Sequence, residues 1–145
     1  MPLDYRIDRD RRVVTATASR ILSDEEVFAY QREVWSRSDL AGFDEIVDLS
    51  PVEDLVLSSG DRVRELAELA SAMDVPEAPS KLAIVASQDL AYGFARMFEA
   101  YRTLNARGAR DVAVFRSMQA ARDWLGVEAP GESPGRGLPG PGAAG

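Results

Sequence analysis

The chain has 145 residues, 46% of them hydrophobic, as expected of one folded domain with its own core. Its formal net charge of −7 argues against nucleic acid or an anionic membrane as the main partner. The absence of cysteine and histidine excludes disulfides, thiol nucleophiles, Cys/His zinc sites and imidazole-based catalysis. We therefore expect no enzyme activity, no metal site and no cofactor.

The N-terminal segment predicts an antiparallel hairpin and then a helix. Residues 3–7 and 12–18 alternate apolar and polar side chains, and the polar stretch 8–11 between them is a turn. Ser23 and Glu26 have the spacing of a capping box, with further acidic residues in the first helical turn. The sequence therefore places a helix start at Ser23.

The middle of the chain predicts a second strand–helix unit. Residues 44–49 are predicted as the third strand, which ends at Ser50 and Pro51, and residues 58–61 have the composition of a helix start. Pro76 and Pro79 end this helix. Its apolar face is expected to comprise Val63, Leu66, Ala67, Ala70 and Met73.

The last unit has the clearest pattern. A strand at 82–86 precedes a long helix from Asp89, and a strand at 111–115 precedes a short helix from Ser117 to Leu125. The long helix has an apolar stripe, which we expect to face the sheet, at Leu90, Phe94, Met97, Tyr101 and Leu104. We expect one contiguous core containing Leu82, Ile84, Phe94, Met97, Tyr101, Val112 and Val114.

These units predict an α/β fold in which a mostly parallel five-stranded sheet, its first strand antiparallel, carries four helices. The domain is expected to span residues 1–127. Residues 128–145 are rich in proline and glycine, and we expect them to form a disordered tail that stability does not require. The sequence shows no signal peptide and no transmembrane run, so the cytoplasm is the expected compartment.

Candidate site residues gather where ligands bind parallel sheets, beyond the carboxyl ends of the strands. A serine or an acidic residue before a helix is also an ordinary N-cap, and this is the simpler role. The expected N-caps are Ser58 for the second helix, Ser87 or Asp89 for the third, and Ser117 for the last. The aromatic cluster between Phe94 and Tyr101 is also compatible with a lipid-sized pocket or with plain core. The candidate ligand or partner residues are Asp48, Ser50, Ser87, Gln88, Asp89, Tyr92, Arg96 and Arg116.

Two short stretches carry a resemblance: Asp48-Leu49-Ser50 at a strand end and Leu57-Ser58-Ser59-Gly60 before a helix. They resemble the signature of the sulfate-transporter and anti-sigma-antagonist (STAS) domain, whose bacterial prototype is SpoIIAA. In regulatory members a partner kinase phosphorylates the serine that matches Ser58, so the resemblance implies Ser58 or Ser59 as a phosphorylation candidate. Leu57 replaces an acidic residue of that signature, and residues 1–126 are also similar to the uncharacterised SpoIIAA-like, or STAS/lipid-transfer-like, branch.

The resemblance implies a non-catalytic, regulatory protein–protein interaction module with a protein partner, and a homodimer is compatible with it. One alternative is a carrier or sensor of a small apolar or lipid-like ligand, bound between the third helix and the sheet. Another is a phosphoserine-switched anti-sigma-factor antagonist. We expect neither nucleic-acid binding nor membrane insertion.

Overall fold

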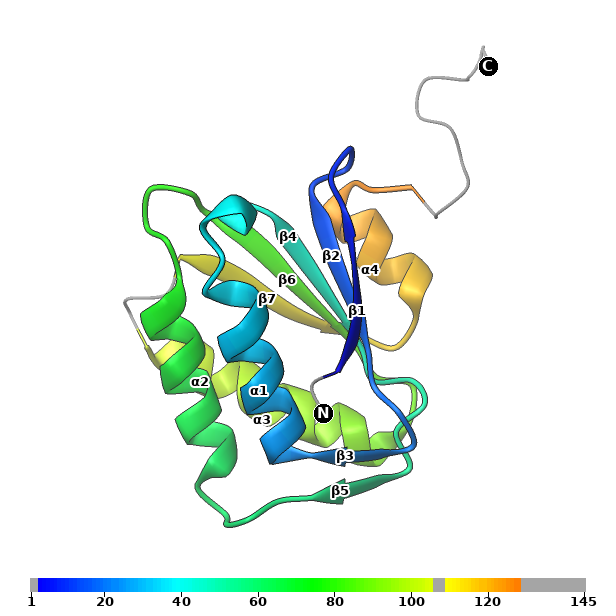
Figure 1. The fold of residues 1–145 in the computed structure, drawn as a ribbon. Coiled ribbons are helices and arrows are strands. Elements are labelled where there is room, and N and C mark those ends of the chain that lie inside the picture. The colour runs from blue at the N-terminus through cyan, green and yellow to red at the C-terminus, as the bar shows by residue number, and fades with distance from the viewer. Residues whose placement is uncertain (1–2, 106–108, 129–145) are drawn as a thin grey trace.

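A computed structural model describes residues 3–105 and 109–128 of the chain. Its centre is a five-stranded sheet in the order β1-β2-β4-β6-β7 (Figure 1). β1 is antiparallel to β2, and each later strand is parallel to its neighbour, which confirms the predicted α/β fold. The strands are β1 (Asp4–Asp8), β2 (Val13–Thr17), β4 (Asp44–Asp48), β6 (Ser80–Val85) and β7 (Arg110–Phe115).

Within the described residues, four helices cover the sheet, three on one face and one on the other (Figure 1). The first three each return the chain to the start of the next parallel strand, so their C-terminal ends lie at the amino ends of β4, β6 and β7. No helix in this part of the chain is long and apolar enough to cross a membrane. The helices are α1 (Asp24–Trp35), α2 (Arg62–Met73), α3 (Asp89–Leu104) and α4 (Met118–Leu125), with a 3₁₀ turn, η1 (Ser38–Leu40), after α1.

A second, two-stranded sheet lies apart from the first. β3 (Ile21–Ser23) pairs in parallel with β5 (Asp54–Val56), and β5 contacts α3. These two strands were not predicted from the sequence. Each has three residues, which is too short for alternation of apolar and polar side chains to be recognised.

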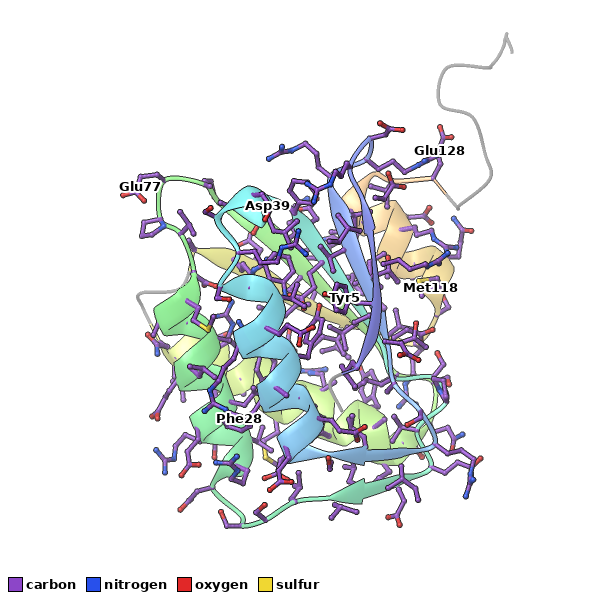
Figure 2. The ribbon with its side chains drawn as sticks, viewed as in Figure 1. Tyr5, Phe28, Asp39, Glu77, Met118 and Glu128 are labelled. Carbon is purple, nitrogen blue, oxygen red and sulfur yellow. The ribbon has the colours of Figure 1, made fainter. Side chains whose placement is uncertain are left out.

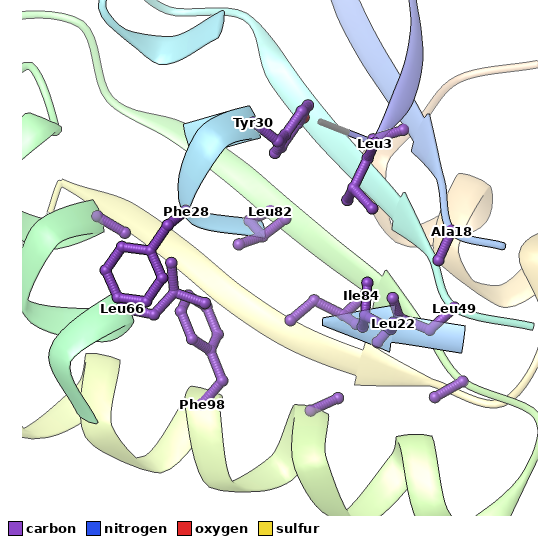
Figure 3. Close-up of a cluster of buried hydrophobic side chains, with 14 of the residues drawn as sticks. Leu3, Ala18, Leu22, Phe28, Tyr30, Leu49, Leu66, Leu82, Ile84 and Phe98 are labelled. Carbon is purple, nitrogen blue, oxygen red and sulfur yellow. The ribbon is translucent and has the colours of Figure 1, made fainter. Parts of the chain in front are cut away.

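The core follows from the alternation of side chains along β6. Leu82 and Ile84 face the three-helix layer, while Ala83 and Val85 face α4. On the three-helix side, one large side chain from each helix meets the others between the layers. Figure 3 shows this contact among Phe28 of α1, Leu66 of α2 and Phe98 of α3.

The expected core face of α3 is wrong. The residues that α3 buries are Ala91, Ala95, Phe98 and Arg102. Met97 is 48% exposed, and Phe94 and Tyr101 are only partly buried against the core. The small side chains of Ala91 and Ala95 allow α3 to lie close to the sheet, and this close approach outweighs the more hydrophobic stripe that the periodicity favoured.

Helix starts agree with the sequence in two cases. The Ser23 hydroxyl accepts a hydrogen bond from the Glu26 N–H at 3.2 Å, and the Glu26 carboxylate accepts one from the Ser23 N–H at 3.1 Å. Ser117 caps α4 through the Ala120 N–H. By contrast, the N-cap positions of the other two helices are Asp61 for α2 and Gln88 for α3.

Ser58, Ser87 and Asp89 are therefore not N-caps as expected. The predicted tail, apart from Glu128, lies outside the described residues.

Candidate functional site

Several of the predicted site residues meet at the carboxyl end of β6 and β7. The Arg116 guanidinium lies 3.8 Å from the centre of the Tyr92 ring and 3.0 Å from an Asp89 carboxylate oxygen. It also donates a hydrogen bond to the Ser87 carbonyl at 3.2 Å. Arg116 thus links the end of β7 to the start of α3, an arrangement that sequence spacing could suggest but not establish.

Arg96 approaches Tyr92 from the next turn of α3. Its guanidinium donates to the Tyr92 hydroxyl at 3.4 Å and pairs with Glu99 at 2.9 Å. The Glu99 charge and the Tyr92 hydrogen bond raise the pKa of Arg96, the Tyr92 hydrogen bond being the larger cause. Arg96 and Arg116 both have carboxylate partners within the chain, and both are exposed, so the cluster is a paired polar surface.

Asp48 and Ser50 form a local turn at the end of β4. The Asp48 carboxylate accepts a hydrogen bond from the Ser50 N–H at 2.9 Å. This is an Asx turn, in which an aspartate side chain holds its own backbone two residues later. Both residues therefore have a structural role at the strand end where the sequence placed them.

Ser58 and Ser59 are exposed in the loop before α2. The Ser58 N–H lies 3.3 Å from the buried Asp24 carboxylate, which also holds Arg62 at 2.6 Å. The Arg62 guanidinium lies 3.9 Å from the centre of the Phe28 ring. The serine pair is therefore accessible, and its loop is fastened to the first turn of α1.

An apolar surface remains on the side of α3 that faces away from the sheet. Five exposed residues at alternating spacings of three and four form one stripe along the helix, which we call the α3 outer face. Exposed apolar surface at helical spacing is typical of a docking surface. The α3 outer face comprises Leu90, Gly93, Met97, Ala100 and Leu104.

The opposite end of the sheet, where the parallel strands begin, contains a buried ionic cluster that was not predicted from the sequence. Arg102, 3% exposed in its side chain, donates to the Ser71 hydroxyl at 2.7 Å and pairs with Asp74 at 3.0 Å. Asp74 also accepts from the Ala109 N–H at 2.8 Å. The cluster ties the ends of α2 and α3 to the start of β7. The signal available was Arg102 itself, which continues the Ala91-Ala95-Phe98 stripe.

Glu45 forms the second half of this cluster. Its carboxylate accepts hydrogen bonds from the Tyr30 hydroxyl at 2.6 Å and from the Trp35 indole at 3.0 Å. Burial and the adjacent Glu45 charge raise the pKa of Tyr30 well above its usual value, burial being the larger cause. The Arg110 guanidinium lies 4.0 Å from the centre of the Trp35 ring. The Tyr30 hydroxyl and the Trp35 indole therefore both donate to the Glu45 carboxylate inside the core.

The space between α3 and the sheet, expected as an alternative ligand pocket, is nearly filled. A cavity of about 50 Å³ remains there, lined by Leu22, Phe94 and Phe98 among others. Small-molecule pockets are usually about 300–1,000 Å³. Among the described residues, no group of three or more acidic side chains is placed to hold a metal ion.

No protein-family model matches the sequence, and no curated protein matches it either. Among solved structures, it is similar to an uncharacterised protein of the DUF3478 family from Shewanella loihica PV-4, which has a SpoIIAA-like fold. The two chains are 18% identical, with a TM-score of 0.49 over 85% of this chain and 91% of that one. A likeness of this size says nothing of function.

Proposed function

We propose that this chain is a non-catalytic, cytoplasmic interaction module that docks through the α3 outer face, with a second copy of the chain as its occupant. The observation that carries the proposal is the exposure of that face. Leu90 is 50% exposed, Met97 48% and Leu104 80%. Large apolar side chains this exposed on one helix stripe favour burial against another protein surface.

Gly93 supports the proposal independently. A glycine inside a helix costs about 1 kcal/mol relative to alanine, so its presence calls for a reason. Within the described residues that reason is absent, because a Cβ atom at Gly93 would meet nothing within 4 Å. A neighbouring helix packed against α3 would supply it, since small residues allow two helix backbones to approach closely.

The occupant follows from the symmetry of the stripe. Read from Leu90 to Leu104, the side chains alternate large, small, large, small, large, with Met97 at the centre. A two-fold axis at Met97 would place two antiparallel α3 helices so that Leu90 lies near Leu104 of the second copy, while Gly93 and Ala100 leave room on either side of Met97 for the Met97 side chain of that copy. Such self-complementarity is the requirement of a symmetric dimer.

The lack of catalysis is proposed on the chemistry of the side chains. The chain has no histidine or cysteine, and the buried carboxylates Glu45 and Asp74 already accept hydrogen bonds from the chain itself. Regulation through Ser58 or Ser59 stays an alternative, favoured by their exposure before α2. Phosphate found on either serine in the native host would support it.

The test is the molar mass in solution, measured by sedimentation equilibrium from micromolar to millimolar protein. We expect the wild type to shift toward dimer with concentration and Met97→Glu to stay monomeric, because a charge at the two-fold axis faces its own copy. Val75→Glu, which changes another exposed apolar residue, is the matched control and should dimerise normally. A monomeric wild type across this range, or dimers of Met97→Glu, would contradict the proposal.

A further inference from the structure

A cavity of about 430 Å³ opens at the end of the main sheet where its parallel strands begin. It lies where α1 and α2 end and where β6 and β7 begin. Figure 2 labels Asp39 in η1 and Glu77 in the loop after α2, each a sequence neighbour of residues that line the cavity. Its volume falls within the range of about 300–1,000 Å³ that is usual for small-molecule sites. It is separate from the α3 outer face and from the polar surface around Arg116.

Arg110 provides unused hydrogen-bond donors in this cavity. Its side chain is nine-tenths buried, and its only hydrogen bond to described residues runs from Nη1 to the Lys81 carbonyl at 3.3 Å. Its separations from Glu45, 3.7 Å, and from Asp74, 3.9 Å, are too long for hydrogen bonds. Nε and Nη2 therefore have no hydrogen-bond acceptor among the described residues, although buried guanidinium groups usually use these donors.

An anion would be attracted by the unused donors of Arg110 and not by an excess of positive charge. The charged residues that line the cavity are Arg37, Asp74 and Arg110. Arg37 is paired with Asp39 at 2.9 Å, and Asp74 is paired with Arg102 at 3.0 Å. Arg110 lies 3.7 Å from Glu45 and 3.9 Å from Asp74, in ion pairs without hydrogen bonds.

The remaining walls are mostly apolar. They include Trp35 of α1 and Leu40 of η1, together with Met73 of α2 and Val75 and Ala78 of the loop after it. A ligand that filled the cavity would therefore bury hydrocarbon against these side chains while it presented an oxygen to Arg110.

We propose that this cavity binds a small organic carboxylate, with its carboxylate on Nε and Nη2 of Arg110 and a short apolar chain between Leu40 and Met73. The guanidinium fork matches a carboxylate in a two-pronged contact, and the Trp35 ring beneath Arg110 holds the fork in place. The ends of α1 and α2 at this end of the sheet carry partial negative charge, which opposes the anion. We therefore expect millimolar affinity for a small probe.

The chain contains a natural reporter for this binding. It has two tryptophans, of which Trp35 lines the cavity and Trp124 lies on the other face of the sheet. Trp124→Phe leaves Trp35 as the single fluorophore and keeps a ring against Phe115. Titration of this variant with hexanoate should give a saturable change in fluorescence.

Two control ligands and three variants make the test decisive. Hexanamide, which has the same carbon skeleton without the charge, and inorganic phosphate, which has charge without the apolar chain, should each bind at least about tenfold more weakly. Arg110→Met should weaken hexanoate binding at least about tenfold, while Arg116→Met, the same change at the opposite end of the sheet, should leave it unaltered. Ala78→Leu fills the cavity without altering a charge and should abolish saturation even if Arg110→Met proves unfolded by circular dichroism.

The proposal is overturned if hexanoate produces no saturable change, or if hexanamide or phosphate binds as tightly as hexanoate. It is also overturned if a folded Arg110→Met or Ala78→Leu protein binds hexanoate like the parent.

Discussion

Asp24 illustrates how one buried side chain connects the start of α1 to the loop before α2. Burial alone would raise its pKa, but hydrogen bonds from Arg62 and Ser58 and the Arg62 charge outweigh burial, so the pKa lies below its usual value. The folded state therefore favours the ionised form. Its stabilising effect is present above the unfolded-state pKa, about 3.9, and is lost as the pH falls through the lower, folded pKa.

We expect Asp24→Asn to lower the free energy of unfolding by about 1–3 kcal/mol at neutral pH, because it removes the charge that holds Arg62. The difference from the wild type should shrink below about pH 4, where the Asp24 carboxyl of the unfolded wild type binds a proton while that of the folded protein is still ionised. Urea unfolding across a pH series measures this. Glu25→Gln removes an exposed carboxylate from the same helix start and is the control. A difference that does not change with pH would contradict the role given to the Asp24 charge.

At the scale of one element, α3 has two apolar faces, and the structure buries the less hydrophobic one. Phe98 faces the core at 7% exposure, while its neighbour Met97 is 48% exposed. Truncating Phe98 to alanine removes its packing in the core beside Phe28 of α1 and Leu66 of α2 (Figure 3) and leaves a cavity.

Phe98→Ala should therefore lower the free energy of unfolding by about 3–5 kcal/mol. Met97→Ala should change it by no more than about 0.5 kcal/mol, measured where the protein is monomeric. Denaturant unfolding of both variants, in the same buffer, provides the comparison. Equal losses for the two would mean that the buried face of α3 is assigned incorrectly.

The two faces of α3 also show what sequence can predict. Periodicity correctly located a helix from Asp89, because apolar residues recur at three and four along it. It could not choose between the faces, since that choice depends on how closely Ala91 and Ala95 allow the helix to approach the sheet. The same limit applies to polar contacts. Sequence patterns of a few residues predicted that Ser23 and Ser117 begin helices, because each caps its own helix. They could not predict the ion pair of Arg102 with Asp74, because these residues are far apart in the sequence.

At the scale of the whole molecule, Arg102 joins α3 to the end of α2, and Asp74 continues the link to β7 through the Ala109 N–H. Removing one member of a buried ion pair leaves the other charge without compensation. Arg102→Met should therefore lower the free energy of unfolding by about 3–5 kcal/mol, measured by urea denaturation.

A double variant separates charge from packing. Arg102→Met combined with Asp74→Asn removes both charges, so part of the lost stability should return relative to Arg102→Met alone. Arg96→Met, which removes an exposed arginine from the same helix, is the control and should cost little. No recovery in the double variant would show that the guanidinium acts through its packing alone.

The strand order has a consequence for synthesis on the ribosome. Each strand of the main sheet pairs with the strand made just before it in that sheet, so the sheet can grow outward one unit at a time as the chain emerges. β7 is made last of these strands and brings Arg110 to Glu45 and Asp74. Until then both carboxylates lack that cation, so a nascent chain that stops before residue 110 has an incomplete charge balance at its sheet edge. The addition of β7 therefore completes the sheet and supplies the last cation to these two carboxylates in a single step.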